Sequence, residues 1–388
     1  MRHVVVVGNG IAGLTAAETL RSEGYAGEMT IIGAETYPAY SRPALSKAAL
    51  LDLDEDLASH FLPAPEHGAA ERLGVSATRL DLPRREVEIT GGEWVPFDGL
   101  VIASGTRASR LSSAPAELTL RGIDDALELR RRLADRPDVV VIGGGALAME
   151  VASGAVKAGC RVTLVSRRTP MLGQAGEVIP QTMAAAALDA GIRLVRSQGV
   201  AVEAADPGRD GGARVILDNE TIEVPLVVSA IGDEANVGWL AGSGLLTDGE
   251  LQVDTRGRVV ADGRVVAGVV AAGDVAAFPT AHGVCRVPLW TSAIEQAKVA
   301  AQALMRGDDA PELSFQSYFW TEQFGISLKV CGELPVSGMP EIVSGSLEER
   351  SAVLRWQHDD GTATSAALGY RISVPKLRAL TRPVGVAA

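Results

Sequence analysis

Nearly unbroken runs of apolar, mostly β-branched residues recur along this chain, which is the pattern of strands buried on both faces of a parallel sheet. They lie at 4–7, 100–103, 139–142, 226–231 and 269–272. The first and third runs lead directly into glycine-rich turns and then into Ala- and Leu-rich stretches that favour helix. This order predicts repeated β-α-β units and therefore an α/β fold.

Two of the runs end in turns of the kind that bind dinucleotides. Gly8–Gly13 reads G-N-G-I-A-G, and Gly143–Ala148 reads G-G-G-A-L-A. The first glycine permits the sharp turn, the second lets a pyrophosphate approach the backbone, and the small third residue lets helix and strand pack closely. One match is weak, but two in one chain indicate two dinucleotides held together. That arrangement serves to pass a hydride from a nicotinamide to a flavin.

The order of segments also predicts the domains. Short segments at 328–330, 352–356 and 363–368 have the character of antiparallel strands, so a small mixed domain is expected after the two β-α-β regions. A helix is expected from Ser292 to Met305, with a linker at 307–311. We predict a discontinuous flavin-binding domain of residues 1–112 and 233–310, a nicotinamide-binding domain of 113–232, and a C-terminal α+β domain of 311–388.

Composition limits the class of partner. The chain has 388 residues, enough for two or three domains with their own cores, and its formal net charge is −12. An acidic protein is not expected to bind nucleic acid, because phosphate binding needs a basic surface. We expect no secretory leader, no membrane span and a cytoplasmic location. Cys160, Cys285 and Cys331 have no metal-ligand spacing, so no metal site is predicted.

Several strings resemble one known family over nearly the whole chain. Besides the two glycine turns, they are Arg42-Pro43-x-Leu45-Ser46-Lys47, Ala103-Ser104-Gly105-Thr106-Arg107, Ala272-Gly273-Asp274, Trp290-Thr291-Ser292-Ala293-Ile294-Glu295-Gln296 and Tyr318-Phe319-Trp320-Thr321-Glu322-Gln323-Phe324-Gly325. On these residues the chain resembles the FAD-dependent NAD(P)H:ferredoxin reductases of oxygenase systems, the group of putidaredoxin reductase and the aromatic-ring dioxygenase reductases. The resemblance implies two Rossmann-like domains in a glutathione-reductase-like three-layer fold, FAD as cofactor and NAD(P)H as co-substrate. It also implies a separate [2Fe–2S] ferredoxin as partner, which feeds a P450 or non-haem oxygenase.

The resemblance assigns residues to FAD. A guanidinium at Arg42 suits phosphate, and an ammonium at Lys47 near the isoalloxazine would stabilise reduced, anionic flavin. Glu35 follows the second strand, where an acidic side chain can bond a ribose hydroxyl. Asp274 ends a buried strand at a position whose relatives bind the ribityl chain or phosphate. The expected FAD contacts are Gly8, Gly10, Ala12, Gly13, Glu35, Arg42, Lys47, Ala103, Gly105, Arg107, Asp274 and Trp290.

The second glycine turn is expected to bind NAD(P)H. NADH-preferring relatives place a carboxylate at the end of the following strand, whereas this chain reads Val165-Ser166-Arg167-Arg168 there. A hydroxyl followed by two guanidiniums suits a 2′-phosphate, which a carboxylate would repel, so NADPH is favoured. Alternatively, the two arginines are surface charges beside a weakened NADH site. The expected contacts are Gly143, Gly145, Ala146, Ala148, Glu150, Ser166, Arg167, Arg168 and Gly232.

Lys47, Glu150 and Trp320 are the expected catalytic residues. By resemblance, Glu150 lies near the nicotinamide and Lys47, and Trp320 borders the flavin and the surface where the acceptor docks. Glu150 would orient the nicotinamide and tune the lysine rather than act as a base, because hydride transfer needs stacking more than proton abstraction.

The cysteine content limits where the electrons can go after the flavin. The sequence has neither a redox-active cysteine pair nor the clustered cysteines that hold an iron–sulfur centre. Electrons must therefore leave the flavin singly for another protein, or go to oxygen. An NAD(P)H oxidase and a rubredoxin reductase stay open as other enzymes, and an NAD(P)H-sensing redox switch stays open as a non-enzymatic alternative.

Overall fold

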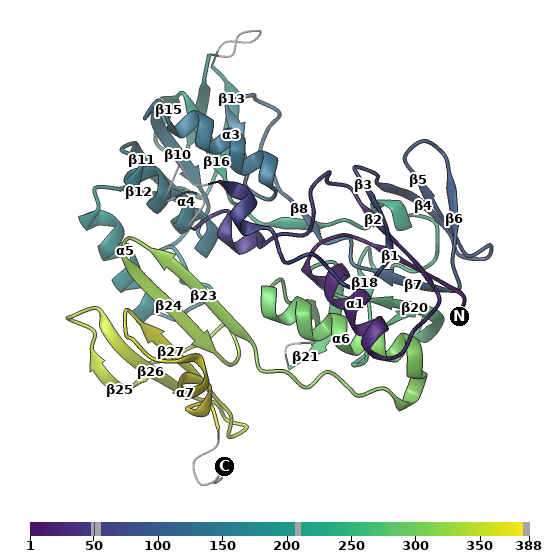
Figure 1. Cartoon of the computed structure of the whole chain (residues 1–388). Coiled ribbons are helices and arrows are strands. Elements are labelled where there is room, and N and C mark those ends of the chain that lie inside the picture. Colours follow the sequence, from purple (N-terminus) through teal and green to yellow (C-terminus); the bar gives the residue numbers. More distant parts are fainter. Residues whose placement is uncertain (48–49, 51–55, 206–210, 282, 383–388) are drawn as a thin grey trace. The chain divides into compact units, whose positions relative to one another are not determined.

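The computed structural model describes residues 1–47, 50, 56–205, 211–281 and 283–382 (Figure 1). Contacts gather the chain into two compact units, each built from three stretches of sequence. Unit 1 is Met1–Ser41, His60–Arg107 and Glu234–Phe315; unit 2 is Arg42–Ser59, Ala108–Asp233 and Gln316–Ala388. The boundaries of the three domains expected from the sequence stay a prediction.

Unit 1 is built on a six-stranded sheet of order β19-β20-β7-β1-β2-β3. Its strands run parallel except for the β19–β20 pair. The bounds are β1 His3–Val7, β2 Glu28–Gly33, β3 Ala70–Leu73, β7 Gly99–Ile102, β19 Arg258–Ala261 and β20 Arg264–Ala271. The apolar runs at 4–7, 100–103 and 269–272 thus form the centre of the sheet, as the sequence predicts.

The valines of β1 are buried on both faces of this sheet, which explains why the run has no polar interruption. Val4 and Val6 pack in the cluster of helices α1 and α6, and Val5 and Val7 pack with a three-stranded sheet on the other face. The two helices lie side by side (Figure 1). The covering elements are α1 Ile11–Ser22, α6 Trp290–Arg306, β4 Ala77–Asp81, β5 Glu86–Ile89 and β6 Trp94–Pro96. This helix–sheet–sheet layering confirms the expected three-layer α/β fold.

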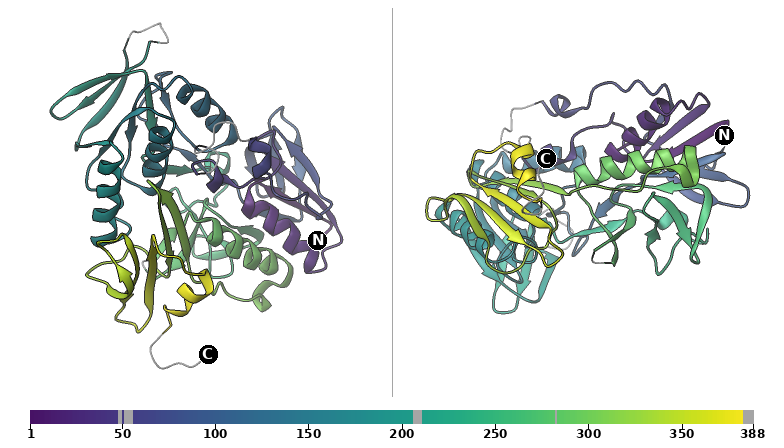
Figure 2. Two further views of the ribbon diagram at one scale, coloured as in Figure 1. Left: turned by 60° about the vertical axis from the view of Figure 1, so that its left-hand side comes forward. Right: turned by 90° about the horizontal axis from the view of Figure 1, so that it is seen from below.

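Unit 2 repeats the plan with a five-stranded parallel sheet of order β12-β11-β10-β16-β9. A small antiparallel sheet packs through Val140 and Ile142 of β10 and projects from one end of the unit (Figure 2). The bounds are β9 Glu117–Leu118, α3 Ile123–Leu133, β10 Asp138–Ile142, α4 Ala146–Lys157, β11 Arg161–Ser166, α5 Val178–Asp189, β12 Arg193–Arg196, β13 Val200–Ala204, β14 Ala213–Leu217, β15 Thr221–Val224 and β16 Leu226–Ser229.

The end of unit 2 is an antiparallel five-stranded sheet, order β23-β24-β27-β26-β25, which helix α7 covers through Leu377. The strands predicted near 328, 352 and 363 are all present. Their bounds are β23 Tyr318–Gln323, β24 Ile326–Cys331, β25 Glu341–Ser346, β26 Ser351–Gln357, β27 Ala363–Leu368 and α7 Val374–Ala379. The helix predicted over 292–305 is α6, which begins at Trp290 and ends at Arg306, and a short 3-10 turn at Gly307–Asp309 occupies most of the expected linker.

Short elements join these layers. They are β8 Thr106–Ala108, β17 Asp233–Ala235, β18 Leu251–Gln252, β21 Ala276–Thr280 and β22 Gly283–Arg286, with 3-10 turns at Arg42–Ala44, Leu57–His60 and Gly238–Leu240. Among the described residues, none of the helices combines the length and apolar character that crossing a membrane requires. The cytoplasmic location stays a prediction.

Candidate functional site

The first glycine turn of unit 1 packs against backbone atoms on its inner side, which we call its closed floor, and has free space on its outer side. A Cβ on Gly8 would lie 2.0 Å from the carbonyl oxygen of Ala103, and a Cβ on Gly13 would lie 1.9 Å from the carbonyl oxygen of Gly8. A Cβ on Gly10 would meet nothing within 4 Å. Helix α1 then starts without a side-chain cap, so its first N–H groups face this open side. The shape and the N–H donors fit a dinucleotide pyrophosphate.

The Ala272-Gly273-Asp274 turn packs against the start of α1. A Cβ on Gly273 would lie 2.9 Å from the Cβ of Ala12, and the N–H of Gly273 donates to Oε1 of the buried Gln296 at 3.0 Å. The end of the Trp290–Gln296 string therefore has a structural role, because its glutamine holds the turn in place. The carbonyl oxygen of Asp274 accepts a hydrogen bond from Arg286 at 3.1 Å.

Other polar groups of unit 1 support the same assignment. The hydroxyl of Tyr40 donates to Oε2 of Glu35 at 2.7 Å, which orients this carboxylate after β2. Among the described residues, Asn9 Nδ2 and Ser292 Oγ are buried without a hydrogen-bond partner. Because a buried unpaired polar group costs about 1–3 kcal/mol, such groups indicate a missing partner. FAD, which offers many acceptors, fits this donor set.

Two expected FAD residues of the Ala103–Arg107 string, Gly105 and Arg107, have different surroundings in the structure. Gly105 has φ +63, a left-handed conformation that favours glycine, and its carbonyl accepts the N–H of Asn236 at 2.9 Å. Arg107 is exposed, and its guanidinium pairs with the carboxylate of Glu234. The side chain of Arg107 therefore already has an anionic partner in unit 1.

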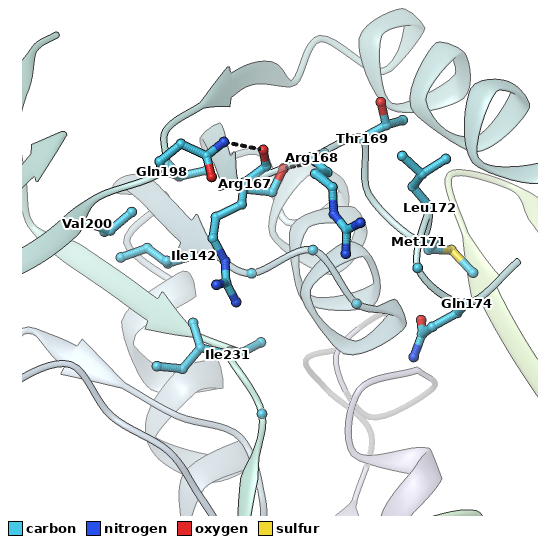
Figure 3. Close-up of a pocket in the computed structure, with 18 of the residues that line it drawn as sticks. Ile142, Arg167, Arg168, Thr169, Met171, Leu172, Gln174, Gln198, Val200 and Ile231 are labelled. Carbon is cyan, nitrogen blue, oxygen red and sulfur yellow. Dashed lines mark hydrogen bonds between the residues drawn. The ribbon is translucent and has the colours of Figure 1, made fainter. Parts of the chain in front are cut away.

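Unit 2 contains a pocket of about 560 Å³ around the second glycine turn (Figure 3). Its described lining includes the turn itself, the end of β11, the segment after it and the end of β16, and none of these lining residues is acidic. The lining residues are Leu111, Ile142, Gly143, Gly144, Gly145, Val165, Ser166, Arg167, Arg168, Thr169, Met171, Leu172, Gly173, Gln174, Gln198, Val200, Ala230, Ile231 and Gly232.

The glycine turn of this pocket repeats the geometry of the first. A Cβ on Gly143 would lie 2.2 Å from the carbonyl oxygen of Ala230, whereas a Cβ on Gly145 would meet nothing within 4 Å. Ala148 replaces the third glycine and is fully buried, and a Cβ on Gly143 would lie 3.1 Å from the Cβ of Ala148. Helix α4 starts at Ala146 without a side-chain cap, so this end also suits a pyrophosphate.

Two exposed arginines border the pocket at the end of β11. Figure 3 shows Arg167 on the side of Ile231 and Arg168 on the side of Met171. Among the described residues, neither guanidinium is paired with a carboxylate at 4.0 Å or less. The hydroxyl of Ser166 donates to the carbonyl of Arg168 at 2.7 Å, so its proton is already used in a hydrogen bond within the turn. The two guanidiniums are therefore the main donors for an anion here.

The expected catalytic residues Lys47, Glu150 and Trp320 come together within unit 2. Lys47 Nζ lies 2.9 Å from Oε1 of Glu150, whose side chain is 4% exposed, and 5.6 Å from the centre of the Trp320 ring. Trp320 stacks on Tyr318 with 5.7 Å between ring centres. The hydroxyls of Ser46 and Thr321 also donate to the carboxylate of Glu150. A buried ion pair persists when such additional donors satisfy the carboxylate, as here.

Arg42 lies in the same unit as Lys47 and not with the first glycine turn. Its Nη1 donates to the carbonyl of Arg121 at 2.9 Å. Its expected contact with FAD stays a prediction, as do the other cofactor contacts assigned by resemblance.

Sequence reasoning missed several residues of these sites. Ser46, Thr321 and Gln323 lie inside the strings that carry the family resemblance, so their position in these strings could have indicated a place near the site. Met171 and Gln198 line the pocket from the loops after β11 and β12, which no local sequence pattern marks as part of a site. Only the folded chain brings these two residues to the glycine turn.

All three cysteines belong to the described part of the chain, and each is a free thiol. Cys160 and Cys331 are buried, and burial raises the pKa of both thiols. A raised pKa disfavours the thiolate, which is the reactive form. These two cysteines therefore have the character of structural residues.

Comparison with known proteins gives consistent matches. Residues 2–303 match the family described as pyridine nucleotide-disulphide oxidoreductase. The chain is 31% identical over 368 residues to the benzene 1,2-dioxygenase system ferredoxin–NAD(+) reductase subunit of Pseudomonas putida, covering 91% of this chain and 85% of that protein. It is 32% identical over 356 residues to rhodocoxin reductase of Rhodococcus erythropolis, covering 89% and 81%.

Solved structures match over similar lengths. The covalent putidaredoxin reductase–putidaredoxin complex matches with a TM-score of 0.84 and 25% identity, covering 98% of this chain and 92% of that one. The ferredoxin reductase for the CYP199A2 system from Rhodopseudomonas palustris matches with a TM-score of 0.83 and 28% identity, covering 95% and 92%.

Proposed function

The chain belongs to the pyridine nucleotide-disulphide oxidoreductase family, and on that premise we propose that it is an FAD-dependent NAD(P)H:ferredoxin oxidoreductase of an oxygenase system. Relatives that align over most of both chains are named ferredoxin–NAD(+) reductase components of dioxygenase systems. One observation carries the proposal most directly. Each unit has a glycine turn with a closed floor and an open outer side, at Gly10 and at Gly145, as two dinucleotides require.

In unit 1 the chain's own residues would bind and orient FAD. The open side at Gly10 and the uncapped start of α1 suit its pyrophosphate, and Glu35, held by Tyr40, suits a ribose hydroxyl. Gln296 keeps the Asp274 turn beside the start of α1. When bound, FAD accepts a hydride from the nicotinamide and gives up the electrons one at a time.

In unit 2, Lys47 and Glu150 would form the charged part of the hydride-transfer site. The ammonium of Lys47 is suited to stabilise negative charge that develops on a reduced ring. The carboxylate of Glu150 lies 2.9 Å from that ammonium and fixes its direction. Because no proton has to be removed in a hydride transfer, neither residue needs to act as a base.

NADPH is the favoured electron donor in this proposal. Arg167 and Arg168 border a pocket whose described lining contains no carboxylate. A 2′-phosphate would gain charge-assisted hydrogen bonds from these guanidiniums, whereas NADH offers only a hydroxyl.

The electron acceptor would be a separate [2Fe–2S] ferredoxin that serves a terminal oxygenase. All three cysteines are free, and within the described residues no group of His, Cys, Asp and Glu could hold a metal. The putidaredoxin reductase structure that matches this chain was solved as a covalent complex with putidaredoxin, its partner.

Anaerobic stopped-flow mixing tests this proposal. Purified protein should be yellow, and NADPH should bleach the flavin faster than NADH does. Turnover should then depend on an added [2Fe–2S] ferredoxin. A preparation that takes up no FAD would refute the proposal. Fast oxygen consumption without any carrier would instead identify an NAD(P)H oxidase.

A further inference from the structure

Strand β23 of the C-terminal sheet places two buried polar side chains beside helix α4. Thr321 is fully buried and Gln323 is 1% exposed. Two positions apart on one strand, they point to the same face of the sheet. Neither residue was expected from the sequence to take part in the reaction, yet both belong to one hydrogen-bonded row with Glu150 and Lys47. We call these four residues the buried polar row.

The direction of each hydrogen bond in the row follows from chemistry. The carboxylate of Glu150, paired with Lys47, can only accept. Thr321 has a single hydroxyl proton, and this proton is donated to Oε1 of Glu150. The hydroxyl oxygen then accepts from Nε2 of Gln323 at 2.8 Å. Donors therefore follow one another from Gln323 toward the carboxylate, and bonds aligned in this way strengthen each other and stabilise the negative charge.

The far end of the row reaches the wall of the nucleotide pocket. Nε2 of Gln323 also lies 3.6 Å from the sulfur of Met171, which lines that pocket. Met171 has φ +65, and its N–H donates to the carbonyl of Gly144 in the glycine turn at 2.7 Å. The pocket wall and the Lys47–Glu150 pair are thus joined through side chains of β23.

A tight turn holds β23 in this position. Phe324 and Gly325, with φ +49 and φ +76, connect β23 to β24. The backbone N–H of Phe324 donates to Oγ of Ser153, on the same helix as Glu150, at 2.8 Å. A left-handed conformation is unfavourable for phenylalanine, so its retention indicates that surrounding contacts determine it. The anchor keeps Thr321 in register with Glu150.

We propose that Thr321 and Gln323 are positioning residues of the hydride-transfer site, through which the C-terminal sheet keeps the carboxylate of Glu150 directed at Lys47. This inference rests on the proposed function, because it assigns a task to residues next to the proposed catalytic pair. Neither residue is assigned a contact with substrate or cofactor. Their effect passes through the carboxylate.

Thr321→Val tests the row, because valine keeps the shape of threonine and removes its hydroxyl. In the FAD-loaded protein, we expect the limiting rate of flavin reduction by NADPH to fall about 10-fold at neutral pH. The Kd for NADPH and the FAD content should change less than about 2-fold, and Thr321→Ser should restore the rate.

Two further variants separate this role from simple support of the fold. Gln323→Met keeps the length of the side chain and removes the donor to Thr321, and a smaller loss of the limiting rate, again without a change in Kd, is expected. Thr364→Val removes another buried hydroxyl of the same sheet, one that donates to the carbonyl of Glu333 at 2.8 Å, and should leave the limiting rate unchanged.

The possible outcomes separate failure of this inference from failure of the proposed function. A limiting rate that Thr321→Ser does not restore, or an equal loss in Thr364→Val, would mean that the hydroxyl only supports the sheet, and the inference would be wrong. If Thr321→Val does not fold, an unchanged limiting rate in Gln323→Met overturns the inference equally. A wild-type flavin that neither NADPH nor NADH reduces would refute the proposed function and this inference together.

Discussion

Lys47 and Glu150 are 103 positions apart in the sequence, yet the lysine Nζ lies 2.9 Å from a carboxylate oxygen of Glu150. The lysine comes from the loop after a 3-10 turn, and the glutamate comes from the first half of α4. Both are largely buried, so each charge depends on the other.

Glu150→Gln should impair both the reaction and the stability of unit 2. The amide keeps the shape of the carboxylate but leaves the ammonium of Lys47 without its anion. Removing one partner of a buried pair costs about 3 kcal/mol, and we expect flavin reduction by NADPH to slow by about 10-fold or more. Thermal unfolding and stopped-flow reduction measure the two effects. Asp138→Asn, which breaks an exposed pair with Arg161 in the same unit, is the matched control.

Replacing Arg167 and Arg168 by Ala should weaken NADPH much more than NADH. Losing charge-assisted hydrogen bonds to a phosphate corresponds to an increase in Kd of about 10- to 100-fold. NADH, which lacks the 2′-phosphate, should lose less than about 3-fold by the same reasoning. Titration of the protein with each nucleotide measures both constants. Arg193→Ala removes a guanidinium that is paired with Glu220 outside the pocket lining and should affect neither nucleotide. Equal weakening of NADPH and NADH would contradict a phosphate contact.

Gly10→Val should yield a folded protein that lacks FAD. A Cβ at Gly10 meets no protein atom within 4 Å, and its φ of −89 is open to any residue, so the fold should tolerate valine. The added side chain would fill the space where the backbone meets the pyrophosphate. Flavin absorbance relative to protein absorbance reports the loss, and circular dichroism reports the fold. Gly238→Val, at another open glycine of unit 1, should keep its flavin. Gly145→Val should do the reverse of Gly10→Val, keeping FAD and losing NADPH.

The stability of unit 1 should fall as the pH drops below 6.5, because His67 is held neutral in the fold. Burial lowers the pKa of its imidazole from 6.5, and its Nδ1 accepts the N–H of Ala69 at 3.1 Å. Between the lowered pKa and 6.5, the unfolded chain binds more protons than the native one, so acid favours unfolding. The contribution is present above pH 6.5 and is lost toward lower pH. His67→Asn should flatten the decline in Tm between pH 7 and pH 5; an unchanged decline would exclude His67 as its source.

Local sequence patterns were sufficient for the repeated β-α-β units and for both glycine turns, whereas the three-layer arrangement was predicted from the family resemblance. Because side chains alternate between the two faces of a strand, the unbroken apolar run at 4–7 predicts a strand buried on both faces. In the structure its valines pack alternately into the two clusters on either side of the sheet. The glycine spacing predicts the open sides at Gly10 and Gly145, because turn geometry depends on neighbouring residues. The three antiparallel segments near the C-terminus follow from the same short-range periodicity, whereas strand β20 starts at Arg264, five residues before the apolar run at 269–272 that predicted it.

What only the tertiary structure decided is which distant side chains meet. Thr321 lies 171 positions from Glu150, and Gln323 lies 152 positions from Met171, and no periodicity encodes such pairs. Their contacts depend on how β23 packs on α4, where the backbone N–H of Phe324 donates to Oγ of Ser153. The motifs therefore determine what can be bound and which charges meet, whereas long-range packing determines which hydroxyl and which amide reach the carboxylate of Glu150.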